Sequence, residues 1–150
     1  MSVLGISLEK NGLRYAVLDG TKAVPSLVGF EKVQTNNFTS TQQLMNWYET
    51  TFQNLLSRYS PTSIGIKVSL NAKKDQISPW YYPLGLLHNM AYQNNIGTFE
   101  FVSGNFVASK FGLEKSVNIY DYIDLKFGVF QPKWDKNQKY ALLAAWMVLK

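Results

Sequence analysis

Two lysines and three aromatic residues lie close together in the middle of the chain. Lys73, Lys74 and the run Trp80-Tyr81-Tyr82 fall within the segment 71–83. Lysine ammonium groups can contact phosphates, and exposed aromatic rings can stack on nucleobases, with roughly 1–3 kcal/mol for each stack. The alternative is that the rings pack beneath the following helix and the lysines merely keep the segment solvated. Lys73, Lys74 and Trp80 are therefore candidate nucleic-acid-binding residues.

Other residue types that carry catalysis are scarce. The chain has one histidine, His88, and no cysteine, which excludes disulfides and thiolate metal sites. His88 falls on the apolar face of a predicted helix with no carboxylate beside it in the sequence. We therefore expect a core or half-buried imidazole with a hydrogen-bonded ring nitrogen. The sequence contains no Gly-x-Ser-x-Gly, Gly-x-Gly or Walker motif, so nucleotide hydrolysis is not expected.

Length and charge set the class of protein. With 150 residues and 46% hydrophobic content, the chain can bury one core, so we expect a single domain spanning residues 1–150. Fifteen Lys and Arg against ten Asp and Glu give a net charge of +5. This balance is compatible with a polyanionic partner, although the charges are scattered along the chain, as on an ordinary solvated surface.

We expect a soluble, cytoplasmic protein without a membrane partner. The N-terminal residues do not show the basic and apolar regions of a secretory signal. The longest apolar run, 141–149, is much shorter than the ~20 residues needed to span a bilayer.

The spacing of apolar residues predicts the elements. Strands are expected at 3–8, 13–19 and 28–33, the first two joined at the Asn-Gly turn of residues 11 and 12. A helix capped by Ser40 or Thr41 and ending before Pro61 is expected next. Its apolar face is formed by Leu44, Trp47, Tyr48, Phe52, Leu55, Leu56 and Tyr59. A strand at 64–70 follows. A strand, a helix and a strand of this length favour a parallel crossover.

The second half alternates in the same way. A helix at 84–94 is predicted with Leu84, Leu87, His88, Ala91 and Tyr92 inward, followed by a strand at 98–102. Short helices are expected at 105–111 and 118–127. A final helix at 136–149 is predicted to bury Tyr140, Leu143, Ala144, Met147 and Val148.

The element order and the first strand, Val3-Leu4-Gly5-Ile6-Ser7, resemble the RNase H-like superfamily and, within it, the bacterial Holliday-junction resolvase (RuvC-like) branch. In that branch the first strand reads apolar-Gly-Ile-Asp. The resemblance implies an α/β fold with a mixed five-stranded sheet, in which a three-strand antiparallel meander is joined by parallel strands and flanked by helices.

The same resemblance locates the positions of the resolvase acids. Ser7 stands at the position of the first-strand Asp, and Lys67 stands at that of the Glu that follows an apolar-Gly-Ile run. Alignment on residues 141–144 places Asn137 and Tyr140 at the two carboxylates of the last helix. None of these four residues is acidic, so the site is catalytically degenerate on this alignment.

Lys67 makes a metal site at this position unfavourable. Two-metal phosphodiester cleavage needs converging carboxylates around two ions about 4 Å apart. A lysine at ~4 Å from a cation costs on the order of 4 kcal/mol per unit charge at an effective dielectric near 20. We therefore expect no metal and no cofactor there. A displaced metal site built from Asp135 with Asp19, Glu31 or Glu100 remains an alternative.

These patterns predict a pseudo-nuclease that acts by binding, with DNA or RNA as the partner and with Lys67, Lys73, Lys74 and Trp80 as the contact residues. One alternative is a protein-interaction or structural module that binds another protein or itself. A second alternative is a metal-dependent nuclease with relocated carboxylates.

Overall fold

The computed structural model describes residues 1–71, 73–128 and 134–150, and the backbone but not the side chain of Gln76. The strands are β1 (Val3–Glu9), β2 (Gly12–Gly20), β3 (Pro25–Gln34), β4 (Ser63–Lys67) and β5 (Gly97–Phe101). The α-helices are α1 (Thr41–Tyr59), α2 (Ile77–Gln93), α3 (Ile119–Phe127) and α4 (Lys136–Val148). Short 3₁₀ turns lie at Lys74–Gln76, Ser103–Asn105 and Ala108–Phe111.

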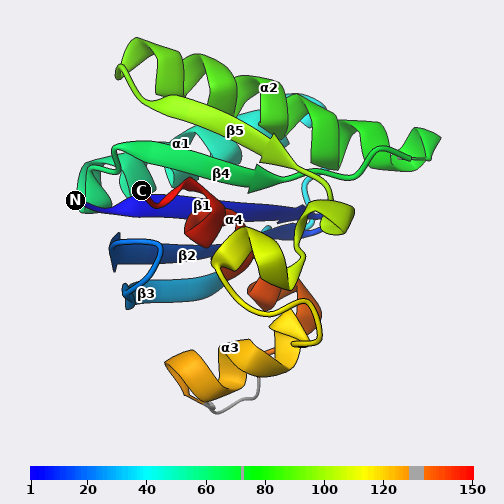
Figure 1. Cartoon of the computed structure of the whole chain (residues 1–150). Helices are drawn as coiled ribbons and strands as arrows, with labels where there is room; N and C mark the ends of the chain where they lie inside the picture. Colours follow the sequence, from blue (N-terminus) through cyan, green and yellow to red (C-terminus); the bar gives the residue numbers. More distant parts are fainter. Residues whose placement is uncertain (72, 129–133) are drawn as a thin grey trace.

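The five strands form one mixed sheet in the order β3-β2-β1-β4-β5 (Figure 1). β1 pairs antiparallel with β2, and β2 pairs antiparallel with β3, which makes the predicted meander. β4 pairs parallel with β1, and β5 pairs parallel with β4. The predicted fold class, the central place of β1 and the parallel crossover are therefore confirmed.

Helices cover the two faces of this sheet (Figure 1). Leu4 and Ile6 of β1 belong to a core cluster with α1 and α2, whereas Val3 belongs to the cluster that contains α4. Side chains alternate between the faces of a strand, so this separation follows from the sequence of β1 itself. Ser40 caps α1 by accepting a hydrogen bond from the Gln43 amide, one of the two caps that the sequence predicted.

The helix α4 lies unusually close to the two central strands. A Cβ atom at Gly5 would overlap the carbonyl oxygen of Ala141, and a Cβ atom at Gly65 would overlap that of Ala144. Both glycines are thus required for the close packing of backbone on backbone. Ala141, Ala144 and Ala145 on the helix are small enough to complete this contact and are fully buried.

The helix α2 differs most from the prediction. It begins at Ile77 rather than Leu84, and it includes Pro79 and Pro83. Pro79 stands in the first turn, where a backbone N–H has no acceptor within the helix, so the ring is tolerated there. The segment 71–83 is therefore largely helical, apart from its first residues, of which Ala72 lies outside the described residues.

Two predicted burial patterns were wrong. Tyr92 is 82% exposed, because the buried stripe of α2 runs through Leu87, Met90 and Ala91 and the next residue points about 100° away. On α4, Tyr140, Met147 and Val148 are half-buried, while Leu142 and Trp146 are buried. The sheet covers one side of α4 and the chain from Phe106 to Phe127 packs on the other, so the burial does not follow a single stripe.

The helices at 118–127 and at the chain end were predicted close to their observed bounds, and β4 proved shorter than predicted. None of the described helices combines the length and the apolar character that a membrane span requires.

Replacing Gly65 with alanine should destabilise the protein by about 3 kcal/mol or more, because the methyl group meets helix backbone that cannot rotate away. Gly85 is a matched control: it lies exposed within α2, and a Cβ there meets nothing within 4 Å. Gly85→Ala should raise stability by about 0.5–1 kcal/mol. Urea unfolding of both variants measures the difference, and equal stability of the two would contradict the packing argument.

Candidate nucleic-acid interface

Two of the four residues that the alignment matches to resolvase acids, Ser7 and Lys67, are neighbours on the adjacent strands β1 and β4. Ser7 of β1 is paired with Arg14 of β2 on one side and with Lys67 of β4 on the other. Each of Ser7 and Lys67 follows a glycine of the α4 contact by two residues, so both side chains point to the α4 face. Ser7 is buried, with 2% of its surface exposed.

Lys67 lies over the ring of Tyr140. Its Nζ atom is 4.6 Å from the ring centroid and donates a hydrogen bond of 3.2 Å to the Ser69 hydroxyl. Burial lowers the pKa of Lys67, and the nearby ammonium of Lys136 lowers it further. None of the described carboxylates lies within ion-pair distance of this lysine.

The structure thus brings three of the four aligned residues, Ser7, Lys67 and Tyr140, to one place at the end of the central strands. Asn137 lies in the first turn of α4 and is exposed. Sequence reasoning did not identify Lys136, the residue before it, whose Nζ atom is 5.8 Å from the same Tyr140 ring. A lysine in the first turn of a helix carries no signal of its own in the sequence, because charged residues are common at solvated helix ends.

Arg14 is a second cation that the sequence analysis missed. Its guanidinium donates to both carboxylate oxygens of Asp135, at 3.1 and 2.6 Å, and its Nε atom lies 2.8 Å from Glu9. Asp135 also caps α4 by accepting a hydrogen bond of 2.9 Å from the Gln138 amide. Arg14 is 9% exposed, so this network anchors the start of α4 to β1 and β2.

The four acids of the displaced metal site do not converge in the structure. Asp135 is engaged by Arg14, whereas Asp19 lies near the N-terminal amine at the other end of β1. Glu31 accepts a hydrogen bond from Tyr15, and Glu100 lies 2.8 Å from His88. The strand residues paired with Glu31 and Glu100 are Tyr15 and Ile66, which belong to the core cluster on the α1 and α2 side of the sheet. Glu31 and Glu100 therefore lie on the face of the sheet opposite to α4. Within residues 1–71, 73–128 and 134–150, no three His, Asp or Glu side chains are grouped as metal ligands.

A groove of about 390 Å³ opens beside Lys67. Its lining includes Lys67, Ser69, Asn71, Trp80 and Ser103, so the predicted pair of Lys67 and Trp80 shares one surface. Trp80 is half-buried, and its Nε1 atom has no hydrogen-bond partner among the residues that the structure describes. Tyr81 is anchored through its hydroxyl, which donates to the Ser69 carbonyl at 3.0 Å.

Lys73 and Lys74 are exposed, and Lys74 begins the 3₁₀ turn that leads into α2. They stand in the segment between the end of β4 and Trp80. Tyr82, the third aromatic residue of the run, is 49% exposed. The aromatic residues thus divide between the two predicted roles. Tyr81 anchors the segment by its hydrogen bond, whereas Trp80 lines the groove, where its ring could stack on a base.

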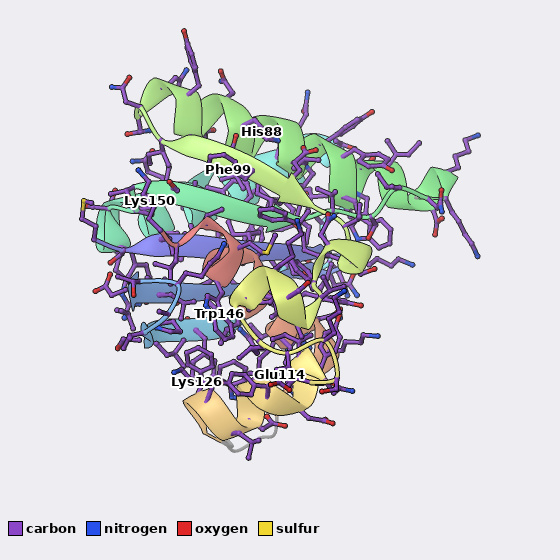
Figure 2. The ribbon with its side chains drawn as sticks, viewed as in Figure 1. His88, Phe99, Glu114, Lys126, Trp146 and Lys150 are labelled. Atoms are coloured by element: carbon purple, nitrogen blue, oxygen red, sulfur yellow. The ribbon has the colours of Figure 1, made fainter. Side chains whose placement is uncertain are left out.

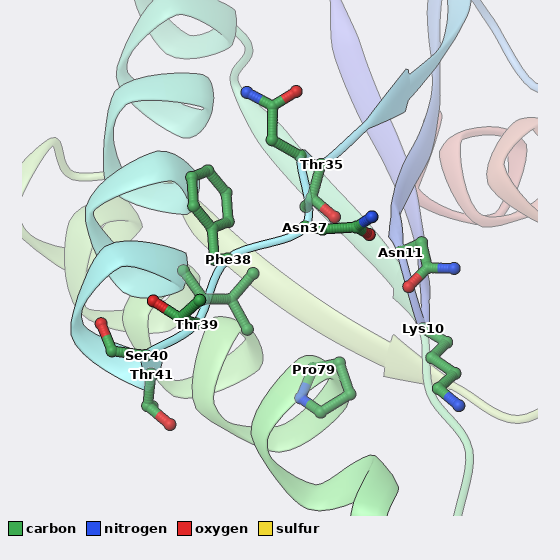
Figure 3. A pocket seen from close by; sticks show the side chains of 11 residues that line it. Lys10, Asn11, Thr35, Asn37, Phe38, Thr39, Ser40, Thr41 and Pro79 are labelled. Atoms are coloured by element: carbon green, nitrogen blue, oxygen red, sulfur yellow. The ribbon is translucent and has the colours of Figure 1, made fainter.

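A second hollow, of about 320 Å³, lies beside the turn between β1 and β2 (Figure 3). Lys10 and Asn11 form one side, and residues 35–41, which lead from β3 into α1, form the other. Pro79 of α2 lies between them. Hydroxyl and amide groups dominate the lining. Lys10 lies 3.9 Å from Asp75, and none of the predicted contact residues lines this hollow.

His88 is half-buried and joins α2 to the edge strand β5 (Figure 2). Its ring nitrogens lie 2.8 Å from the Thr98 hydroxyl and 2.8 Å from Glu100. The predicted half-buried, hydrogen-bonded imidazole is therefore confirmed. No carboxylate lies beside His88 in the sequence, but Glu100 of β5 supplies one in the structure.

No protein-family model and no curated protein matches this chain. Solved structures do resemble it. RuvC of Thermus thermophilus in complex with a Holliday junction substrate superposes with a TM-score of 0.77 at 14% identity, over 98% of this chain and 91% of that chain.

Two further resolvases are similar at lower scores. The fowlpox virus Holliday junction resolvase gives a TM-score of 0.61 at 14% identity, over 96% of this chain and 94% of that chain. The yeast mitochondrial Holliday junction resolvase Ydc2 gives 0.62 at 16% identity, over 97% and 78%. The superpositions establish the fold, whereas sequence identities this low leave the activity open. The chain has the RNase H-like fold of the RuvC-type Holliday-junction resolvases.

Proposed function

We propose that this protein binds nucleic acid along the groove beside Lys67 and acts by binding rather than by metal-dependent cleavage. The observation that carries the proposal is that Lys67 lines an open groove together with Trp80. The sequence alignment matches Lys67 to a carboxylate that would hold metal ions in a resolvase. A lysine there can neutralise a backbone phosphate directly, which is the charge that bound cations would otherwise neutralise.

Three features support this function. Trp80 is half-buried and lines the groove, so its ring can offer a face for stacking on an unpaired base. Lys73 and Lys74 are exposed in the segment that joins the groove residue Asn71 to α2. The structures of the Thermus and fowlpox resolvases with Holliday junctions show that this fold can carry branched DNA. We therefore include four-way junctions among the candidate ligands.

A protein-binding role is the second candidate, because large apolar side chains are exposed near the edge of the sheet. Tyr92 and Tyr82 of α2 are 82% and 49% exposed, and Phe99 of the edge strand β5 is 51% exposed (Figure 2). Exposed rings of this kind are common where another protein binds. Size-exclusion chromatography in the binding buffer separates this role from the first, since self-association would not need nucleic acid.

The binding proposal is tested by fluorescence anisotropy with single-stranded, duplex and four-way-junction DNA and with RNA, without divalent ions and over a range of salt. Lys67→Ala, Lys73→Ala and Lys74→Ala should each weaken binding to all sequences. Each should also reduce the magnitude of the salt slope by about 0.7 to 0.9, since counterion release scales with the phosphates contacted.

Lys126→Ala is the matched control for these variants, because Lys126 is exposed on α3, away from the groove (Figure 2). It should leave the salt slope unchanged. An equal loss in all four variants would mean that binding follows net charge alone, and the proposed groove would then be wrong.

Trp80→Ala should act differently from the lysine variants. It should lower the affinity for single strands by about 1–3 kcal/mol and leave the salt slope nearly unchanged, because a stacking ring releases no counterion. Tyr92→Ala, which removes an exposed ring farther along α2, is the control and should bind as the parent protein does. Circular dichroism checks that both variants are folded. A change in salt slope without loss of affinity would contradict the stacking role.

Mg²⁺ or Mn²⁺ should not raise the melting temperature at constant ionic strength, because Ser7, Asn137 and Tyr140 offer neutral oxygens beside a cationic Lys67. Specific metal binding to the folded state would stabilise it. A metal-dependent rise that disappears in Asp135→Asn would instead support relocated carboxylates. Asn retains the capping capacity of Asp but loses the ion pair with Arg14, so the metal-dependent rise is measured against the variant's own melting temperature without metal.

A further inference from the structure

Two ammonium groups from distant parts of the chain gather on one aromatic ring. Lys67, at the end of β4, and Lys136, the first residue of α4, lie 4.6 and 5.8 Å from the centroid of Tyr140. Lys136 also lies 5.3 Å from the centroid of Tyr120. The negative faces of these rings attract cations and hold both ammonium groups near one point.

The positive charge at this point is not neutralised by the neighbouring acids. Asp135, next to Lys136 in the sequence, is engaged by Arg14, and Asp124 of α3 lies 3.0 Å from Lys139. Burial and the neighbouring Tyr140 raise the pKa of Tyr120 to about 12, so its phenol is uncharged near neutral pH. Two like charges that share a partly buried site repel each other unless an anion lies between them.

The site is open to a ligand. Lys67 is part of the lining of the 390 Å³ groove, together with Ser69 and Ser103, whose hydroxyl groups can also donate to an anion. Lys136 does not line the groove, but it is exposed, and its ammonium is close enough to Lys67 to lower the pKa of that lysine. An anion in the groove can therefore reach Lys67, and the flexible, exposed side chain of Lys136 can turn toward the same anion.

We propose that Lys67, Lys136 and Tyr140 form a phosphate site that prefers a phosphate monoester, such as the terminal phosphate of a nucleic-acid strand, over an internal phosphodiester. A monoester carries about −1.5 to −2 charges at neutral pH, whereas a diester carries one, so the monoester matches two ammonium groups better. The inference rests on the proposed function for the identity of the ligand, but the anion site itself can be tested without nucleic acid.

The experiment compares one labelled single strand with a 5′-phosphate and the same strand with a 5′-hydroxyl, at matched ionic strength. The phosphorylated strand should bind about tenfold tighter to the parent protein, as expected for added charge-assisted hydrogen bonds. Lys136→Met should remove this preference, and because Lys136 is exposed the variant should fold. Lys136→Arg should retain much of it, and the exposed Lys126→Met is the control that should retain all of it.

Two further measurements separate a phosphate site from general positive charge. The preference should fall below about pH 6, where the terminal phosphate loses its second charge. At equal ionic strength, inorganic phosphate should raise the melting temperature more in the parent protein than in Lys136→Met, because the general stabilisation of folded proteins by phosphate is common to both and only binding at the site differs.

The outcomes distinguish this inference from the proposed function. Salt-dependent binding of the 5′-hydroxyl strand with no gain from the 5′-phosphate would overturn the site and leave the proposed function standing. If no strand binds, a phosphate-dependent rise in melting temperature that is larger in the parent protein than in Lys136→Met would support the site with a small phosphorylated compound as its ligand. The absence of both responses would overturn the site as well.

Discussion

The close approach of α4 to the central strands is the constraint on which the rest of the structure depends. Gly5 and Gly65 have no side chain, so the helix backbone rests directly on β1 and β4. Two residues farther along these strands, Ser7 and Lys67 must then point toward the first turns of α4. The same packing places Tyr140, which precedes Ala141 on the helix, under the Lys67 ammonium.

Within this frame, the charges at the end of the central strands are opposite to those of a metal-dependent nuclease. Such a site requires carboxylates that share cations. Here the protein supplies the cations itself: Arg14 pairs with Glu9 and Asp135, Lys67 lines the groove, and Lys67 and Lys136 both lie near the Tyr140 ring. The same backbone geometry therefore presents positive charge to a ligand, which suits an anionic partner better than a divalent ion.

Most of the fold was predictable because short-range patterns determine it. Alternation in β1 and β2, the helical spacing of α1 and the Asn-Gly turn are local properties, and the order of elements restricts the topology to few arrangements. The start of α2 and the exposure of Tyr92 were not predictable in this way. They depend on whether buried proline rings are accommodated and on where the sheet ends, and both are properties of the packed core.

For the candidate site, the sequence by itself was enough to select Ser7 and Lys67, because both follow recognisable strand motifs. Tertiary structure decided how their charges are balanced. Arg14 of β2 pairs with Asp135 at the start of α4, and Lys67 of β4 lies near the Tyr140 ring of α4, as Lys136 does. Contacts across such separations leave no periodic signal in the chain, since electrostatic pairing depends on distance in space and not on spacing in sequence.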